Sequence, residues 1–534
     1  MSKDVLLNLG QHGSLRGTVS LDVTHRFLNI PYALPPIGER RWRKPVHLPK
    51  DHIYTDEAHS SSARDCTTYG DICLQPPYLV NGKDMSIVPG ANYSEDCLVV
   101  NIWKPTKPLP TSGEEKWPVL AWIHGGWLQI GSPSHQERHW PEGLIDPDGG
   151  GLNAVVVSIG YRLNIFGFLA GHDLKGNFGF WDQRCALEWV QDYIHYFGGD
   201  RNKVTLGGHS AGAYSTHAQL QYELLHTDGS RPLFHNVWLC SNAIPAQPKS
   251  LEEATTQLEN VFAHFQISPS LPLSQRLDGL RKIDGTKLIE SFHKLRLHTF
   301  RAVTDGEFIR GDMIEKFRDG TFARLFKERG VRILIGETEN EQWLYSKVVP
   351  PESLAGLPRA LENYYAAQVC ERLMSLSQYQ ATLDISSSTD NDDRAEAERL
   401  YGMITSDAQV RAPIRALCHQ LMSNGVPVER ILRYRIALRP RCLDKFYPPE
   451  AGVTHGGDMY TWWLTRHMGL MDSEAVLISD WLKGSLCSLV NSEPFEWVSR
   501  EEDGYVYLGE DGSVEVVHDE HWKRLGQVID LVLS

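Results

Sequence analysis

The sequence predicts an α/β fold in which helices flank a large, mostly parallel central sheet. Short apolar runs alternate with segments of helical spacing, and one apolar run leads into a glycine-rich turn followed by helix-compatible residues. Short apolar runs bounded by turns suit strands that are buried on both faces, and their alternation with helices favours parallel pairing. The expected strands lie at residues 119–123, 154–159, 204–206, 331–335 and 431–437.

The expected helices fill the segments between these strands. Apolar residues recur at helical spacing between residues 182 and 197, which predicts an amphipathic helix. Residues 211–225 are compatible with a second helix. Two longer regions, at about 250–330 and 344–430, are rich in helix formers and read as helical insertions packed above the sheet. Within the second region, residues 386–393 are expected to form a polar loop.

Chain length leaves the number of domains open. At 534 residues the chain exceeds the roughly 250–300 at which a single core usually stops growing. It therefore forms either one large domain or two to three lobes. A separate C-terminal module from about residue 495 is a further alternative. The aromatic residues there look more like packing residues, which favours one domain; they are Trp497, Tyr505, Tyr507 and Trp522.

Composition argues against several classes of partner. The net charge is −14 and the chain carries no basic stripe, which argues against nucleic-acid binding and against adsorption to anionic membranes. No apolar run approaches the ~20 residues that span a bilayer. The N-terminal apolar stretch is too short for a secretory signal, so we expect a cytoplasmic protein. Nine cysteines without close CxxC pairs predict no zinc site and demand no disulfide framework.

The most informative motif is Gly-His-Ser-Ala-Gly at residues 208–212, between an expected strand and an expected helix. A serine hydroxyl is a poor nucleophile unless the backbone lifts it clear of its neighbours and aims it at a base. A strand-turn-helix corner does this, and the flanking glycines allow the tight turn. Ser210 is therefore a candidate nucleophile; the alternative is a glycine-rich turn without chemistry.

A second glycine loop offers backbone donors near such a nucleophile. The sequence Trp-Ile-His-Gly-Gly-Trp at residues 122–127 directly follows an expected strand. Attack on an ester carbonyl creates an oxyanion, which backbone N–H groups stabilise when they already point at it. Loss of one such donor typically costs ~2.7–4 kcal/mol. Taken alone, this loop is equally compatible with a simple glycine turn and with an oxyanion-binding loop.

A base and an acid are expected further along the chain. His455 lies in a glycine-flanked loop after the last expected strand, where a general base should fall. Three acids follow the strand at residues 331–335, and spacing alone does not choose between Glu337, Glu339 and Glu341. The resulting chain order of serine, acid and histidine is typical of hydrolases that use a nucleophile elbow.

From about residue 15 to about residue 522 the chain resembles the type-B carboxylesterase and cholinesterase-like family of α/β-hydrolases. The resemblance implies one α/β-hydrolase domain over residues 1–534, with the helical insertions lying over the active site. It is closer to intracellular fungal members than to secreted animal ones. The segments that carry it are residues 27–33 (FLNIPYA), 95–103 (EDCLVVNIW), 177–184 (NFGFWDQR), 197–200 (FGGD) and 207–212 (GGHSAG).

The resemblance also assigns roles to individual residues. It selects Glu341 as the acid, although the flanking residues depart from the family's D-E-G pattern, and His455 as the base. It places the oxyanion donors at Gly126, Trp127 and Ala211. A tryptophan in place of the family's third glycine is a departure, and it is strained if the position needs a positive φ. The indole then either lines the acyl pocket or packs in the core.

These roles imply a serine ester hydrolase that forms an acyl-enzyme on Ser210, with His455 as base and Glu341 orienting the imidazole. The implied substrate is a small-molecule ester, and no metal or organic cofactor is needed. An acyltransferase or lactone-processing enzyme with the same triad is an alternative, which an aromatic pocket containing Trp127, Trp462 and Trp463 would favour. A catalytically inactive cholinesterase-like binding protein fits less well, because the triad is complete.

Four further expectations complete the sequence analysis. His209, beside the nucleophile, either packs against its neighbours or makes the substrate pocket sensitive to pH. The family pattern suggests a disulfide between Cys73 and Cys97, which an intracellular redox state would disfavour. Residues 74–94 contain no tryptophan for a quaternary ammonium group, so cholinesterase activity is not expected. The chain is expected to be a monomer or a homodimer.

Overall fold

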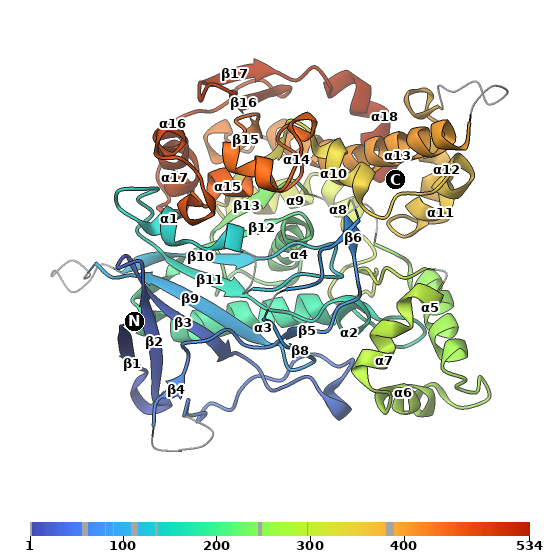
Figure 1. Ribbon diagram of the computed structural model, residues 1–534, viewed down its shortest axis with the longest axis horizontal. Coiled ribbons are helices and arrows are strands. Elements are labelled where there is room, and N and C mark those ends of the chain that lie inside the picture. Colours follow the sequence, from blue (N-terminus) through green and yellow to red (C-terminus); the bar gives the residue numbers. More distant parts are fainter. Residues whose placement is uncertain are drawn as a thin grey trace.

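A single twisted sheet runs through the protein (Figure 1). The computed structural model describes residues 3–55, 62–80, 82–88, 90–107, 116–133, 137–243, 248–295, 297–380 and 389–533. The strands are, in spatial order, β1 (Asp4–Asn8), β2 (Ser14–Ser20), β3 (Thr24–Pro31), β9 (Val99–Pro105), β11 (Val155–Ile159), β10 (Trp117–Ile123), β12 (Gly199–His209), β13 (Asn236–Cys240), β14 (Arg332–Thr338), β15 (Ile431–Ile436), β16 (Gly504–Leu508) and β17 (Val514–His518).

The pairing confirms the predicted mixed, mostly parallel sheet. Neighbouring strands from β11 to β16 are parallel, and antiparallel strands close both ends of the sheet. All five expected strands are present within a few residues of their predicted bounds. The sequence analysis missed β13 and the antiparallel N-terminal strands. Because β16 pairs with β15, the C-terminal segment joins the main sheet, and Trp497 stacks on Trp481 with ring centroids 5.8 Å apart.

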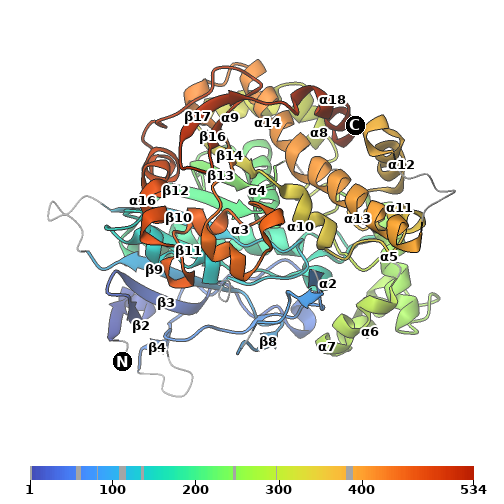
Figure 2. The same ribbon diagram turned by 45° about the horizontal axis from the view of Figure 1, so that its top comes forward.

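Alternating side chains of β10 belong to two separate hydrophobic clusters, one on each face of the sheet. Val119 and Ile123 pack in the cluster that contains the inner faces of α3 (Phe178–Tyr193) and α4 (Ala211–His226). Leu120 and Trp122 point to the other face. Such strands, buried on both faces, are typical of parallel sheets with helices on each side. In Figure 2, α4 lies beside β12 and β13, the two strands that it contacts.

The helix predicted at residues 182–197 begins earlier, as α3, and ends in a 3₁₀ turn, Ile194–Phe197. The two helix-rich regions contain helices, of which Figure 1 places α5, α6 and α7 at the lower right and α11, α12 and α13 at the upper right. The first region holds α5 (Leu251–His264), α6 (Leu273–Arg281), α7 (Gly285–Glu290), α8 (Met313–Arg318) and α9 (Thr321–Glu328). The second holds α10 (Glu341–Lys347), α11 (Leu357–Glu362), α12 (Ala367–Ser375), α13 (Asp390–Ser406) and α14 (Ala412–Ser423).

The polar loop predicted at residues 386–393 is wrong where the structure can be compared with it. Residues 386–388 lie outside the described residues, and α13 begins at Asp390. The Thr389 hydroxyl accepts a hydrogen bond from the Asp392 N–H (3.3 Å) and donates one to its carboxylate (2.7 Å). This capping box, together with acids in the first turn, starts a helix in a segment whose composition resembles a loop.

A buried ion-pair network joins β14 and β15 to α14 and the segment before the last helix. Two nitrogens of the Arg415 guanidinium each lie 2.9 Å from a Glu337 carboxylate oxygen, and a third lies 2.7 Å from Asp519. Arg433 pairs with Asp519, and Arg435 lies 3.1 Å from Glu337. Burial alone would raise the pKa of Glu337, but Arg415 and Arg435 outweigh it and hold the pKa below its usual range.

We expect the substitution Arg415→Met to lower the free energy of unfolding by about 3–5 kcal/mol, because it leaves buried carboxylates short of counter-charge. Chemical denaturation at neutral pH measures the loss. The matched control is Arg394→Met, which removes an exposed arginine that pairs with Glu398 at 3.2 Å. It should change stability by less than about 1 kcal/mol. Equal losses in both variants would contradict a stabilising role for the network.

Candidate active site

Ser210 occupies the strand-turn-helix corner that the sequence predicts, between β12 and α4. Its φ of +56° is rare for a residue with a side chain. A Cβ on Gly208 would lie 2.3 Å from the Gly212 backbone, and one on Gly212 would lie 2.0 Å from the Ile123 carbonyl oxygen. The glycines are therefore required by close backbone contacts, and the strain is concentrated at the serine, as at many functional sites.

His455 and Glu341 form a buried pair. The Nδ1–H of His455 donates to the Glu341 carboxylate at 2.5 Å, and the two side chains are 2% and 0% exposed. The other carboxylate oxygen accepts from the Ser241 hydroxyl (2.7 Å) and from the Thr338 N–H (2.9 Å). Burial would raise the pKa of Glu341, but these partners, His455 first, lower it. The carboxylate therefore stays ionised and fixes the tautomer of the imidazole.

The second ring nitrogen of the histidine remains available. The Nε2 atom of His455 is buried and has no hydrogen-bond partner in the part of the chain that the structure describes. Ser210 and His455 line the same cavity. A ring nitrogen without a partner, on a residue that lines the same cavity as Ser210, is suited to a general base, and catalytic contacts are commonly loose before substrate binds.

The three acids among which sequence spacing could not choose have different surroundings in the structure. Glu341 contacts His455, as the family resemblance suggested. Glu337 is committed to the ion-pair network with Arg415. Burial raises the pKa of Glu339, and its side chain makes no hydrogen bond or ion pair with His455 among the described residues. Of these acids, Glu341 alone contacts His455 among the described residues.

The loop after β10 presents strained backbone. Gly126 has φ +109°, and a Cβ there would lie 2.1 Å from the Ile130 carbonyl oxygen. Trp127 and Leu128 have φ of +57° and +63°, so the tryptophan does occupy the unfavourable region. The N–H groups of Gly126, Trp127 and Ala211 donate to no acceptor among the described residues. Three free donors flanking a serine can bind a negatively charged oxygen.

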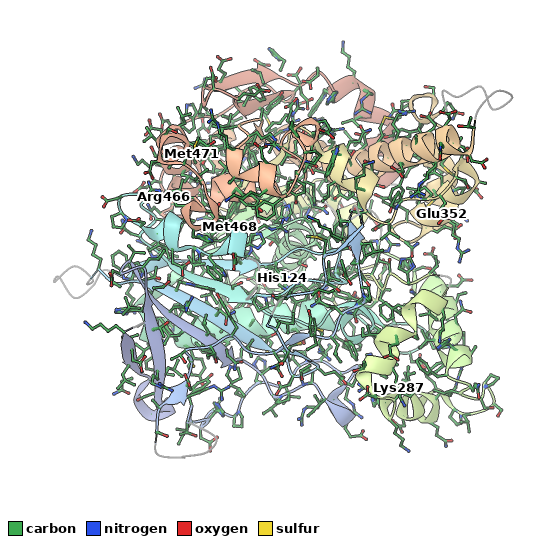
Figure 3. The ribbon with its side chains drawn as sticks, in the orientation of Figure 1. His124, Lys287, Glu352, Arg466, Met468 and Met471 are labelled. Atoms are coloured by element: carbon green, nitrogen blue, oxygen red, sulfur yellow. The ribbon has the colours of Figure 1, made fainter. Side chains whose placement is uncertain are left out.

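Two cavities adjoin Ser210. The larger, about 490 Å³, is also lined by His455, His209 and the glycine loop. The smaller, about 70 Å³, extends toward Tyr214 and Arg301. Trp127 lines both and stacks on Tyr78 with ring centroids 4.8 Å apart. Figure 3 labels Met468, which lines the larger cavity, and His124, which precedes the glycine loop.

The expected aromatic pocket contains Trp127, but its other two expected members, Trp462 and Trp463, are placed elsewhere. Both side chains are fully buried in the hydrophobic cluster on the far face of the sheet. Trp463 packs edge-on against Trp122 at 5.0 Å, and neither indole lines a cavity beside Ser210 in the described structure. Their apolar character serves core packing, which is the usual role of a buried tryptophan.

His209 is buried next to the nucleophile position and lines the larger cavity. Its ring centroid lies 4.7 Å from that of His455. Burial, then the charges of His455 and Arg138, lower the pKa of His209 well below 6.5. The ring is therefore neutral around pH 7, and its part in substrate binding stays a prediction.

Sequence reasoning missed two residues beside the histidine pair. The Tyr345 ring, one turn after Glu341, lies 4.8 Å from the His455 ring. Asp458, three residues after His455, is fully buried and accepts from the Trp462 indole at 3.1 Å. Burial and the Glu341 charge raise the pKa of Asp458 to about 8. The position of Asp458 in the same loop as His455 was the one sequence feature that could have pointed to it.

The disulfide suggested by the resemblance is not formed. All nine cysteines are buried free thiols, and contact with the Cys73 thiol, together with burial, raises the pKa of Cys97. Within the described ranges, no group of three or more His, Cys, Asp or Glu side chains is arranged to hold a metal ion. Nor does any described helix have the length and apolar character needed to cross a membrane.

Comparisons with known proteins agree with this geometry. A family model described as "Carboxylesterase family" matches residues 3–480. An uncharacterized esterase/lipase of Schizosaccharomyces pombe is 39% identical over 532 residues, covering 98% of this chain and 95% of the relative. A carboxylic ester hydrolase of Gibberella moniliformis is 33% identical, covering 97% and 94%. A para-nitrobenzyl esterase of Bacillus subtilis is 30% identical, covering 68% and 69%.

We expect Asp458→Asn to stabilise the protein increasingly as pH rises. The folded carboxyl holds its proton up to a pKa of about 8, whereas an unfolded aspartate ionises near 3.9. Wild-type stability therefore falls between these values by up to about 1.4 kcal/mol per pH unit, and the amide removes this penalty.

Denaturation of wild type and Asp458→Asn at pH 5, 6.5 and 7.5 measures this difference. Asp480→Asn, at an exposed position, is the matched control and should change stability by less than about 0.5 kcal/mol. A difference between Asp458→Asn and wild type that does not grow with pH would show that Asp458 is ionised in the folded protein.

Proposed function

Because the chain belongs to the carboxylesterase family, we propose that it cleaves esters through an acyl-enzyme formed on Ser210. The family prediction is confirmed, and by family and relatives the protein is a carboxylic ester hydrolase. The observation that carries the assignment of residues is the buried contact between His455 and Glu341 at a cavity shared with Ser210.

In the proposed reaction, Nε2 of His455 takes the Ser210 proton as the serine oxygen attacks the ester carbonyl. The imidazolium that forms lies against the ionised Glu341, which stabilises its charge. His455 then gives the proton to the departing alkoxide, and the acyl group remains on Ser210. Water, activated by the same imidazole, attacks the acyl-enzyme and releases the acid.

The N–H groups of Gly126, Trp127 and Ala211 are the proposed oxyanion donors. Two features support this role: they have no acceptor among the described residues, and the backbone at Trp127 is held in a strained conformation. Donors that are already oriented need no reorganisation as charge develops on the carbonyl oxygen, which is why such sites lower the barrier.

Water is the acyl acceptor that the larger cavity favours. Its lining includes the charged side chains Lys83, Glu137 and Arg138, which retain water, whereas acyl transfer to another alcohol requires water to be excluded. Of the three tryptophans that supported the transferase alternative, Trp462 and Trp463 lie in the core, and Trp127 alone lines the cavities among the described residues.

The substitution Ser210→Ala should lower kcat for p-nitrophenyl acetate by at least about 10⁴-fold, because it removes the nucleophile. It should also abolish labelling by an organophosphate. Ser473→Ala, at an exposed position of the helix Asp472–Leu482, is the matched control and should behave as wild type. Undiminished hydrolysis by folded Ser210→Ala protein would overturn the assignment.

A further inference from the structure

The smaller cavity beside Ser210 is lined by a positive charge that has no ion-pair partner in the part of the chain that the structure describes. Arg301 lines it, and the Nε and Nη2 atoms of its guanidinium are buried without a hydrogen-bond partner among the described residues. A guanidinium cannot discard its charge at physiological pH. Burial of an unpaired charge is costly, so such a group is normally paired.

The backbone around Arg301 is held in place on both sides. The Gln129 side chain, from the loop that carries the proposed oxyanion donors, donates to the Phe300 carbonyl (2.5 Å) and accepts from its N–H (3.0 Å). The Asn177 side chain makes the same two contacts with Val303, at 2.8 and 3.0 Å. Arg301 therefore sits on a fixed segment tied directly to the oxyanion loop.

The charge of Glu253 acts on Arg301, but no carboxylate among the described residues forms an ion pair with it. The Glu253 carboxylate accepts from the Ser250 N–H at 3.1 Å and completes the cap of α5. The charge of Arg301 also reaches Lys249: burial, and then Arg301, lower the pKa of Lys249 to about 7, against the opposing charges of Glu253 and Glu362. The surroundings of the smaller cavity therefore favour an anion.

We infer that Arg301 binds a carboxylate on the substrate, so that the enzyme prefers esters carrying a negative charge close to the scissile bond. The inference rests on the proposed ester cleavage at Ser210, which lines the same cavity. Arginine matches a carboxylate through two parallel N–H contacts. The cavity of about 70 Å³ has room for roughly two water-sized groups, so the charge should be one or two carbons from the ester.

Two pairs of short esters test the inference and locate the charge. Methyl hydrogen succinate carries the carboxylate on the acyl side, and dimethyl succinate is its neutral partner. Acetoxyacetate carries it on the alcohol side, and methyl acetoxyacetate is its neutral partner. We expect kcat/KM to favour the charged member of one pair by at least about tenfold. Preference for the neutral member in both pairs would overturn the inference.

Arg301→Met should lower the charged-to-neutral ratio of kcat/KM at least tenfold, and Arg301→Lys should restore part of it. Arg324→Met removes an exposed arginine of α9 and should leave the ratio unchanged. A ratio that survives in Arg301→Met, or that falls equally in Arg324→Met, would contradict a local role for Arg301.

Binding separates this inference from the proposed function. Calorimetric titration of folded Ser210→Ala protein, with no turnover, should show tighter binding of the charged member of the preferred pair than of its neutral partner. Adding Arg301→Met should remove that difference. If the difference is absent, the inference fails even though Ser210 catalyses ester cleavage; if it is present without any turnover by wild type, the proposed function fails instead.

Discussion

The site depends on two hydrogen bonds that join the loop bearing the acid to the loop bearing the base. The Asn340 N–H donates to the Val453 carbonyl oxygen at 3.0 Å, and the Thr454 hydroxyl accepts from the Leu344 N–H at 3.0 Å. Asn340 also caps α10 through its side chain. With both loops held together, Glu341 and His455 meet in a fully buried space. A carboxylate can remain ionised there because each oxygen accepts a hydrogen bond.

Two glutamates at or just after the end of β14 have different partners and different roles. Glu337 joins an arginine network that ties β14 and β15 to α14, and Glu341 supports the histidine. Both carboxylates are buried and have lowered pKa values, so a low pKa alone would not identify the catalytic acid. The partner does: arginines hold one in place, and an imidazole with a free second nitrogen contacts the other.

Local patterns in the sequence predicted the parallel strands and the corner at Ser210, whereas the family resemblance pointed to Trp127 as a position that is strained if its φ is positive. They failed where the outcome depends on contacts distant in the chain. Composition made residues 389–393 look like a loop, although Thr389 caps a helix. Trp462 and Trp463 were assigned to a pocket because burial in the far core is not visible in sequence. Arg301 gave no signal, since its isolation becomes apparent only when the surrounding chain is placed. The single domain, cytoplasmic location and oligomeric state stay predictions.

The most direct test of the central claim compares Glu341→Gln with Glu337→Gln, assayed for ester hydrolysis and for thermal stability. The account predicts that Glu341→Gln lowers kcat by about 10⁴-fold, because the amide favours the wrong imidazole tautomer, with the smaller loss of stability. Glu337→Gln should lower the melting temperature more and retain most of kcat below it. Near wild-type kcat in Glu341→Gln would contradict the account.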